Sequence, residues 1–206
     1  MIELFVHPKD PQPRAIQALV EGLRQGAVMI YPTDTVYGLG CDIFQTKAIE
    51  RICRIKQIDP LKVPLSFICA NLSELSRYTK SIDTPLYRLL RSCLPGPFTF
   101  ILPASREVPK ILKTKKATIG LRVPEHPVVK AILSGLGHPI LSASLPGTWA
   151  DEIADPENIR ERFENQVDYL VNGGPGGVVP STIIDCTGPA PVIVREGLGK
   201  LPPAAD

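Results

Sequence analysis

The sequence predicts an α/β fold in which helices pack against a twisted, mixed β-sheet with a concave site at its strand ends. Apolar runs of strand length alternate with segments of helical spacing along most of the chain, which is the pattern of α/β proteins. Near the end, several strand-like runs follow one another without an intervening helix, so we expect a mixed sheet and not a purely parallel one. A length of 206 residues, 44% hydrophobic and 21% charged, predicts a single domain over residues 1–206.

The first predicted elements are a helix and a buried strand. Apolar residues recur at helical spacing over residues 16–23, Asp10-Pro11 provides a start, and Gly26 provides a stop. The apolar run 27–31 is predicted to be a strand. It ends at Pro32, because proline has no N–H for the strand ladder and has a fixed φ.

Three helices and a strand are predicted next. The second helix covers about 46–57, and the apolar run 65–69 is a strand. Asn71 with Glu74 is a capping box that opens a short helix. Asp83 before Pro85 opens another, because proline suits the first helical turn.

The remaining elements follow a basic segment. Strands are predicted at 98–102 and 118–123, on either side of the lysine-rich segment 110–116. A helix at 127–136 leads into a strand at 140–142. Three further strands complete the sheet, at 169–171, 182–184 and 191–194.

The segment Tyr31–Leu39 carries many hydrogen-bonding groups directly after a core strand. It holds two threonines, an aspartate and two tyrosines in nine positions, and it runs into Gly38–Gly40, which we interpret as a small-residue turn. Thr33, Thr35 and Tyr37 are therefore presented at a strand end, where open α/β sheets usually bind ligands.

Charge alone does not predict a nucleic-acid partner, because the net charge is only +2. The distribution is uneven, however. Residues 103–135 hold seven Lys or Arg against two acids, and residues 151–168 hold seven acids against two arginines. A basic face is therefore compatible with the nearly neutral total.

The cysteines and the apolar runs indicate a cytoplasmic protein. The five cysteines, widely spaced and without a CxxC pair, are Cys41, Cys53, Cys69, Cys93 and Cys186. We expect free, buried thiols in a reducing compartment. A catalytic thiol at Cys41 or Cys186 is the less favoured alternative, since neither has a histidine nearby in sequence. No apolar stretch approaches the ~20 residues that span a bilayer, and the N-terminus lacks a signal-peptide pattern.

No metal site is predicted from ligand spacing. The three histidines, none of which pairs at metal-ligand spacing, are His7, His126 and His138. Asp34 and Asp185 are candidate general bases or Mg²⁺ ligands, with ordinary capping as an equal alternative. The loop Gly173–Gly177 lacks the GxxxxGK[ST] and GxGxxG spacings, so we interpret it as a mobile loop and not as a phosphate cradle.

Seven segments in a fixed order carry a family resemblance. They are Tyr31–Leu39, Arg51–Gln57, Pro95–Leu102, Ile119–Pro124, Pro139–Ser144, Ser181–Asp185 and Val194–Gly197. Together they resemble the threonylcarbamoyl-adenylate synthase family, which has the YrdC-like domain, and most closely its YciO subgroup. The resemblance spans about residues 11–200, which would form the core of a single YrdC-like domain.

The resemblance implies a nucleotidyltransferase reaction. L-threonine condenses with bicarbonate, and the product joins the AMP part of ATP while pyrophosphate leaves. Mg²⁺ would share the phosphate charge. The threonylcarbamoyl-adenylate then serves the t6A modification of tRNA, at an adenosine beside the anticodon.

The same resemblance assigns site residues. The positions that match threonine contacts are Thr35, Arg122, Ser142 and Ser181, those that match nucleotide contacts are Lys56, Thr118, Ser144 and Arg195, and those with an implied catalytic role are Lys56 and Ser144. Arg122 ends a strand, and its guanidinium fork fits a carboxylate, although a surface salt bridge is the alternative. A local turn is the alternative for Thr35, and burial in a strand is the alternative for Thr118.

Two positions depart from the family pattern. Synthases carry Lys-x-Arg and Ser-x-Asn, whereas this chain has Lys56-Gln57-Ile58 and Ser144-Leu145-Pro146. Neither isoleucine nor proline can replace the missing donors. Each lost charge-assisted contact typically costs ~1.5–3 kcal/mol, so we expect a weak synthase, unless Lys62 supplies the missing charge.

Two alternatives stay open. The first is a non-catalytic module that binds double-stranded RNA or tRNA through a basic surface formed by Arg51, Arg54, Lys56, Lys110, Lys113, Lys115 and Lys116. A solvated loop explains residues 110–116 equally well, and no aromatic residue lies among these lysines to stack on bases. The second alternative is a related carbamoyl-adenylate chemistry on another amino acid.

Overall fold

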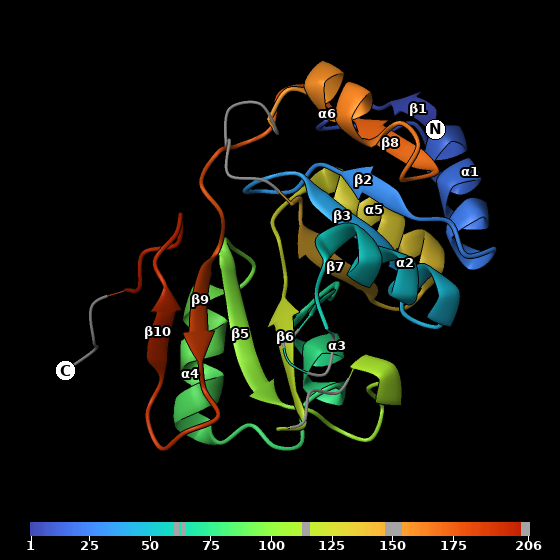
Figure 1. Ribbon diagram of the computed structural model, residues 1–206. Helices are drawn as coiled ribbons and strands as arrows, with labels where there is room; N and C mark the ends of the chain where they lie inside the picture. The colour runs from blue at the N-terminus through green and yellow to red at the C-terminus, as the bar shows by residue number, and fades with distance from the viewer. Residues whose placement is uncertain (60–61, 63–64, 113–115, 147–153, 203–206) are drawn as a thin grey trace.

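The computed structural model describes residues 1–59, 62, 65–112, 116–146 and 154–202. These residues form one ten-stranded sheet in the order β1-β8-β2-β3-β7-β4-β6-β5-β9-β10 (Figure 1). The strands are β1 (Ile2–Phe5), β2 (Met29–Tyr31), β3 (Gly38–Asp42), β4 (Ser66–Ile68), β5 (Phe98–Pro103), β6 (Thr118–Arg122), β7 (Ile140–Ser144), β8 (Tyr169–Asn172), β9 (Thr182–Asp185) and β10 (Val192–Arg195). The helices are α1 (Pro13–Arg24), α2 (Thr46–Lys56), α3 (Leu72–Arg77), α4 (Thr84–Cys93), α5 (Pro127–Leu136) and α6 (Pro156–Phe163), with a 3₁₀ turn η1 at Lys110–Leu112.

The sheet is mixed, which confirms the predicted fold class. β8 pairs parallel with both β1 and β2, and β4 with β6 and β5 with β9 are also parallel. The other neighbouring pairs are antiparallel. That all 206 residues form a single domain stays a prediction, since part of the chain lies outside the described ranges.

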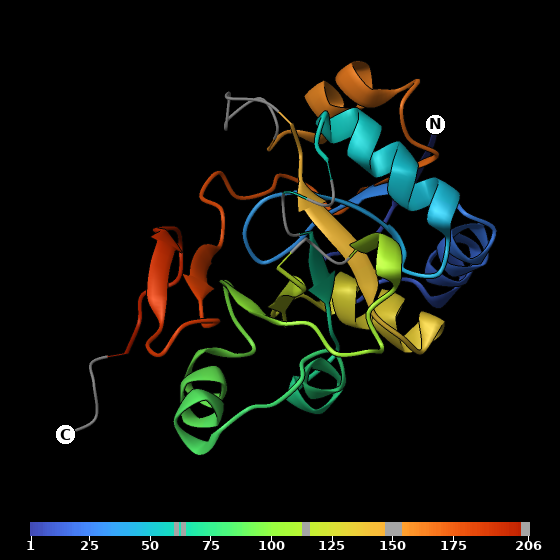
Figure 2. The same cartoon turned by 60° about the horizontal axis from the view of Figure 1, so that its bottom comes forward.

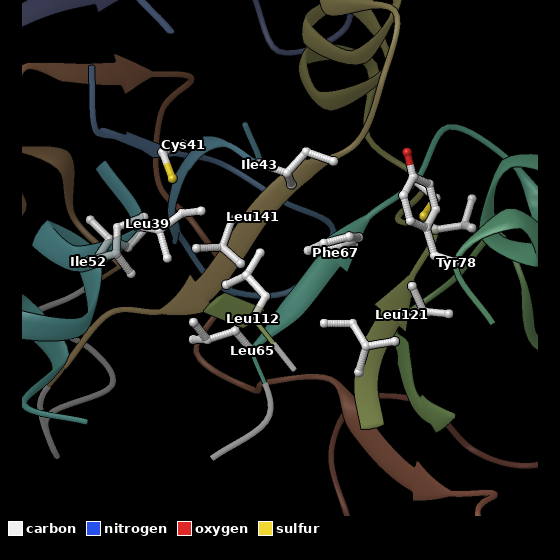
Figure 3. Close-up of a cluster of buried hydrophobic side chains, with 14 of the residues drawn as sticks. Leu39, Cys41, Ile43, Ile52, Leu65, Phe67, Tyr78, Leu112, Leu121 and Leu141 are labelled. Atoms are coloured by element: carbon white, nitrogen blue, oxygen red, sulfur yellow. The ribbon is translucent and has the colours of Figure 1, made fainter. Parts of the chain in front are cut away.

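Helices cover both faces of the sheet. α1 lies beside α5 (Figure 1 and Figure 2), and the two pack with alternate residues of β2, such as Met29 and Tyr31, in one apolar cluster. α2, α3, α4 and α6 contribute to a larger cluster with Ile30, Phe67 and Leu121 (Figure 3). Adjacent strand residues such as Ile30 and Tyr31 therefore pack on opposite sides, as the pleat requires.

All eight predicted strands and five predicted helices are present, and three elements were not predicted: β1, β3 and α6. The start signals at Asn71 and Asp83 are confirmed, because each side chain accepts a hydrogen bond from the backbone N–H three residues later. α6 begins with Asp155 capping the Glu157 N–H inside a mostly polar segment. Its weak apolar periodicity explains why the sequence pattern did not reveal it.

The predicted turn at Gly38–Gly40 is wrong, because these residues begin β3 in the middle of the sheet. Glycine usually weakens a strand, but it is used where another group approaches closely. A Cβ at Gly40 would lie 2.8 Å from a ring carbon of Tyr31 and 3.0 Å from the Leu141 carbonyl oxygen. The glycines therefore make room for the Tyr31 ring.

The prediction of free thiols is confirmed, and that of buried thiols holds for four of the five cysteines. All five cysteines are free, and only Cys186 is partly exposed. Burial raises the pKa of the Cys41 thiol and raises that of Cys186 to about 11, so both stay protonated at neutral pH.

In the described part of the chain, no helix is long and apolar enough to cross a membrane.

Candidate functional site

A polar cavity of about 210 Å³ lies on the sheet face that α1 and α5 cover only in part. Ile68 and Ile140 pack with those helices, so Ser66, Ser142 and Ser144, two or four residues away, point to the same face. The polar side chains that line the cavity are those of Thr33, Tyr37, Lys56, Ser66, Thr99, Arg122, Ser142, Ser144, Ser181 and Arg195. Segments from all parts of the chain thus meet at this point.

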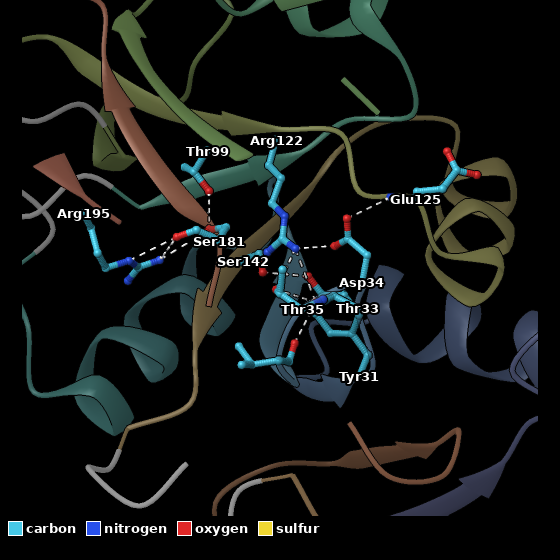
Figure 4. Close-up of polar contacts among 11 residues, drawn as sticks. Tyr31, Thr33, Asp34, Thr35, Thr99, Arg122, Glu125, Ser142, Ser181 and Arg195 are labelled. Atoms are coloured by element: carbon cyan, nitrogen blue, oxygen red, sulfur yellow. Dashed lines mark hydrogen bonds and ion pairs between the residues drawn. The ribbon is translucent and has the colours of Figure 1, made fainter. Parts of the chain in front are cut away.

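Arg122, the last residue of β6, is the most buried cation of the cavity, with 8% of its surface exposed. Its Nη2 donates hydrogen bonds to the Thr35 hydroxyl at 2.7 Å and to the Asp34 carboxylate (Figure 4). The Thr33 hydroxyl lies 3.5 Å from the same nitrogen. The loop after β2 therefore holds one side of the guanidinium.

Tyr31 is hydrogen-bonded to the same cluster. Its hydroxyl donates a 2.6 Å hydrogen bond to the Ser142 Oγ, and burial raises the pKa of Tyr31 to about 12. The phenol is therefore a neutral donor over the physiological pH range. It fixes the Ser142 side chain beside Arg122 (Figure 4).

Arg195 reaches the cavity from β10. Its guanidinium donates to the main-chain carbonyl of Ser181 at 2.8 Å and lies 3.3 Å from the Ser181 Oγ. The Ser181 hydroxyl also shares a 2.8 Å hydrogen bond with that of Thr99 on β5. Figure 4 shows Ser181 between Arg195 and Arg122, and all three line the first cavity together with Thr99.

Lys56, the last residue of α2, completes the set. Its Nζ donates to the Ser144 carbonyl oxygen at 2.7 Å and lies 3.3 Å from the Ser144 Oγ. α2 ends here because Gln57 adopts a left-handed conformation, with φ of 54°. The helix end thus points its final cation at the end of β7.

The cavity attracts anions. Three cations line it and no Asp or Glu of the described residues does. Burial, with a smaller contribution from Arg195, lowers the pKa of Lys56. Burial, with a smaller contribution from Arg122, lowers the pKa of Arg195. The cations repel one another across the cavity, and a bound polyanion would relieve this repulsion.

A second cavity of about 430 Å³ adjoins the first, and Thr33 lines both. Thr35, Asp34 and His126 line it together with the loop 173–179. Burial lowers the pKa of His126, against a smaller opposing effect of Asp34. In the described part of the chain, the His126 Nδ1 is buried without a hydrogen-bond partner.

The glycine-rich loop 173–177 is attached to the opening motif. The Tyr37 hydroxyl donates to the Gly174 carbonyl at 2.7 Å and accepts from the Gly173 N–H at 3.2 Å. Gly177 lies so close to the Thr35 carbonyl that a Cβ would come within 2.0 Å of that oxygen. Only glycine fits here, and the reason is this close backbone approach.

The predicted site residues are brought together with one exception. Six of them line the first cavity: Lys56, Arg122, Ser142, Ser144, Ser181 and Arg195. Thr35 bonds to Arg122 from the second cavity. Thr118 begins β6, at the other end from Arg122, and lines neither cavity. Its nucleotide contact stays a prediction.

The described residues of the predicted RNA surface lie in two segments, α2 and the region of η1. Arg51 forms a 2.7 Å ion pair with Asp168 and lines another cavity. Arg54 is exposed on α2, and Lys110 and Lys116 are exposed in and after η1. Lys113 and Lys115 lie outside the described residues. RNA binding by this group stays a prediction.

Several residues of the site were not assigned from the sequence. Thr99, Ser66 and Tyr31 lie in predicted strands. The sequence pattern did not show which face of the sheet each side chain occupies, so it did not mark them as site residues. Ser66 required the pairing of β4 with β7, which places it opposite Ser142. Thr99 required the parallel pairing of β5 with β9, which sequence pattern does not reveal.

The described residues contain no group of three or more His, Cys, Asp or Glu side chains that could hold a metal ion. Asp34 is engaged by Arg122, and Asp185 accepts hydrogen bonds from Thr187. Neither lies in a cluster that fits Mg²⁺. A Mg²⁺ ion held chiefly by substrate phosphates would not require such a group.

Comparison with known proteins identifies the family. A family model named for Sua5, YciO and YrdC, and described as telomere recombination, matches residues 21–197. This chain belongs to the Sua5/YciO/YrdC family. Escherichia coli YciO, named as an uncharacterized protein, is 46% identical over 97% of each chain, and its crystal structure superposes with a TM-score of 0.91.

Other members of the Sua5/YciO/YrdC family carry an activity in their names. A threonylcarbamoyl-AMP synthase of Pseudoalteromonas translucida is 35% identical, over 82% of this chain and 92% of that protein. The structure of P. abyssi Sua5 complexed with L-threonine has a TM-score of 0.83 at 28% identity. The match covers 96% of this chain and 58% of that Sua5 chain.

The two departures from the expected synthase pattern lie outside the cavity in this family member. Ile58 packs at the margin of the larger apolar cluster. Pro146 follows β7 in a bend and does not line the cavity. Lys62 is exposed and forms a 3.8 Å ion pair with Asp59. The described residues thus supply no replacement cation at these positions.

Proposed function

We propose that this protein is an ATP-dependent L-threonylcarbamoyladenylate synthase whose product supports t6A modification of tRNA. The observation that carries the proposal is the first cavity, where Lys56, Arg122 and Arg195 converge and no described lining residue carries a carboxylate. The reaction needs a site for a triphosphate and for an amino-acid carboxylate. The names of the synthase relatives and the L-threonine complex of Sua5 support the same reaction.

The chemistry proceeds in two balanced steps. The threonine amine attacks bicarbonate, a C–N bond forms, and water leaves with the formation of a carbamate. A carbamate oxygen then attacks the α-phosphorus of ATP, and the bond to the β-phosphate oxygen breaks to release pyrophosphate. The second step moves negative charge onto pyrophosphate, and cations placed around it lower its barrier.

We assign roles in this scheme to seven residues of the two cavities. Arg122, with Thr35, binds the threonine carboxylate, and Ser142 and Ser181 contact the substrate. Lys56 and Arg195 stabilise the phosphates, and the Ser144 hydroxyl orients the nucleotide beside Lys56. Because Ile58 and Pro146 offer no donors, we expect turnover below that of synthases with the full set.

The direct test incubates purified protein with L-threonine, bicarbonate, Mg²⁺ and ATP labelled in its α-phosphate. We expect formation of a labelled adenylate and release of unlabelled pyrophosphate. Both products should require threonine and bicarbonate. L-serine in place of threonine tests the alternative amino-acid substrate. Loss of product in Lys56→Ala, with Arg54→Ala unaffected, would tie the activity to this cavity. The absence of labelled adenylate with the wild-type protein would refute the proposal.

A further inference from the structure

Asp34 bridges two elements that form the site. One of its carboxylate oxygens accepts from Arg122 Nη2 and the other from the Glu125 N–H at 3.2 Å (Figure 4). Only 11% of the Asp34 side chain is exposed. The carboxylate therefore links the loop after β2 to the segment between β6 and α5.

This bridge determines which donors of Arg122 remain for a ligand. Nη2 faces Asp34, Thr35 and Thr33. The Nε is buried and has no hydrogen-bond partner in the described ranges. Buried donors are nearly always paired in folded proteins, so this Nε–H lacks a partner that a bound ligand would supply.

A substrate carboxylate would gain nothing by displacing Asp34. Displacement would leave a buried carboxylate without its cation and the Glu125 N–H without its acceptor, and an unpaired buried charge is strongly unfavourable. The ligand instead approaches the side of the guanidinium that Asp34 leaves open.

From this geometry we propose that Asp34 is a positioning residue for substrate recognition, an inference that rests on the proposed function. Asp34 fixes the Arg122 guanidinium so that its Nε–H meets the carboxylate of the amino-acid substrate. It acts through Arg122 and does not touch the substrate. The nucleotide, bound through Lys56 and Arg195, depends little on Asp34.

The test compares Asp34→Asn and Asp34→Glu with Asp83→Ala. Asp83 is a matched control, because its carboxylate also accepts a backbone N–H, that of Leu86 on α4, away from both cavities. For Asp34→Asn we expect the KM for L-threonine to rise at least about tenfold while the KM for ATP stays within about twofold. Asp34→Glu restores part of the threonine affinity, and Asp83→Ala lowers the melting temperature without changing either KM.

Calorimetric titration of L-threonine into each variant, without ATP or bicarbonate, separates this inference from the proposed function. Wild-type protein that binds threonine but makes no adenylate would refute the function and leave the inference standing if Asp34→Asn loses affinity. Equal threonine affinity in wild type and Asp34→Asn would overturn the inference. So would a parallel loss of threonine and ATP affinity that follows the melting temperature. Failure of wild-type protein to bind threonine would overturn both.

Discussion

Lys56 Nζ donates a 2.7 Å hydrogen bond to the main-chain carbonyl of Ser144, which lies 88 residues away in sequence. The bond joins the C-terminal end of α2 to the last residue of β7. A carbonyl satisfies only one of the three ammonium N–H donors. The Ser144 Oγ, at 3.3 Å, takes a second donor, so this lysine closes the cavity wall while its charge and its third N–H can serve a phosphate.

Replacing Lys56 by Ala is expected to reduce kcat/KM for ATP by roughly 10- to 100-fold, because a charge-assisted hydrogen bond contributes about 1.5–3 kcal/mol. Steady-state formation of labelled adenylate measures the effect. Arg54→Ala is the control, since Arg54 is an exposed cation on the same helix. A kcat/KM equal to that of wild type would exclude Lys56 from the site.

Nucleotide affinity is expected to fall as pH rises through the lowered pKa of Lys56, which lies below the ordinary value of 10.5. The sign follows from the charge, because only the protonated lysine attracts phosphate. In the absence of ligand, the folding stability of the protein changes with pH in the opposite direction to the nucleotide affinity. The unfolded lysine holds its proton in the window between the lowered pKa and 10.5, so stability increases with pH there.

Calorimetric ATP titrations between neutral and alkaline pH measure the affinity change. Lys56→Met should bind ATP weakly at every pH and should lose this dependence. If the slope of wild-type protein persisted in Lys56→Met, another group would be responsible for the titration.

Gly40→Ala is expected to destabilise the protein by about 1–3 kcal/mol, as overpacking of a core does. The new methyl group would lie 2.8 Å from the Tyr31 ring and 3.0 Å from a backbone oxygen. Urea unfolding followed by circular dichroism gives the free energy of unfolding. Gly188→Ala is the matched control, because its nearest contact is an ordinary 3.9 Å. Equal stability of the two variants would contradict the close packing of Tyr31 on β3.

Ala117→Gly is expected to stabilise the protein by up to about 1 kcal/mol. Ala117 has φ of 51°, a left-handed conformation that costs an L-residue about 1–2 kcal/mol. Glycine would remove this cost. Its greater conformational entropy in the unfolded chain, however, lowers the stability of the folded protein by about 0.5–1 kcal/mol. Chemical denaturation against wild type tests the balance, and a loss of stability would show that the alanine methyl group has a packing role.

The predictions from local pattern succeeded where one short segment contains its own signal. The capping side chains of Asn71 and Asp83 and the apolar spacing of α5 are examples. β3 was missed for the opposite reason. Its glycines suggest a turn when read alone, and only contact with Tyr31 explains them as strand residues.

By itself, the sequence determined the α/β class and the mixed sheet, because periodicity and caps are properties of neighbouring residues. Its resemblance to the synthase family indicated six of the ten polar side chains that line the cavity. Only the tertiary structure decided that Asp34 pairs with Arg122, that Thr99 meets Ser181, and that Thr118 stays outside. These relationships depend on which strands are neighbours and which face each side chain takes. Such non-local pairings follow from the packing of the whole chain, not from the spacing of residues within any segment.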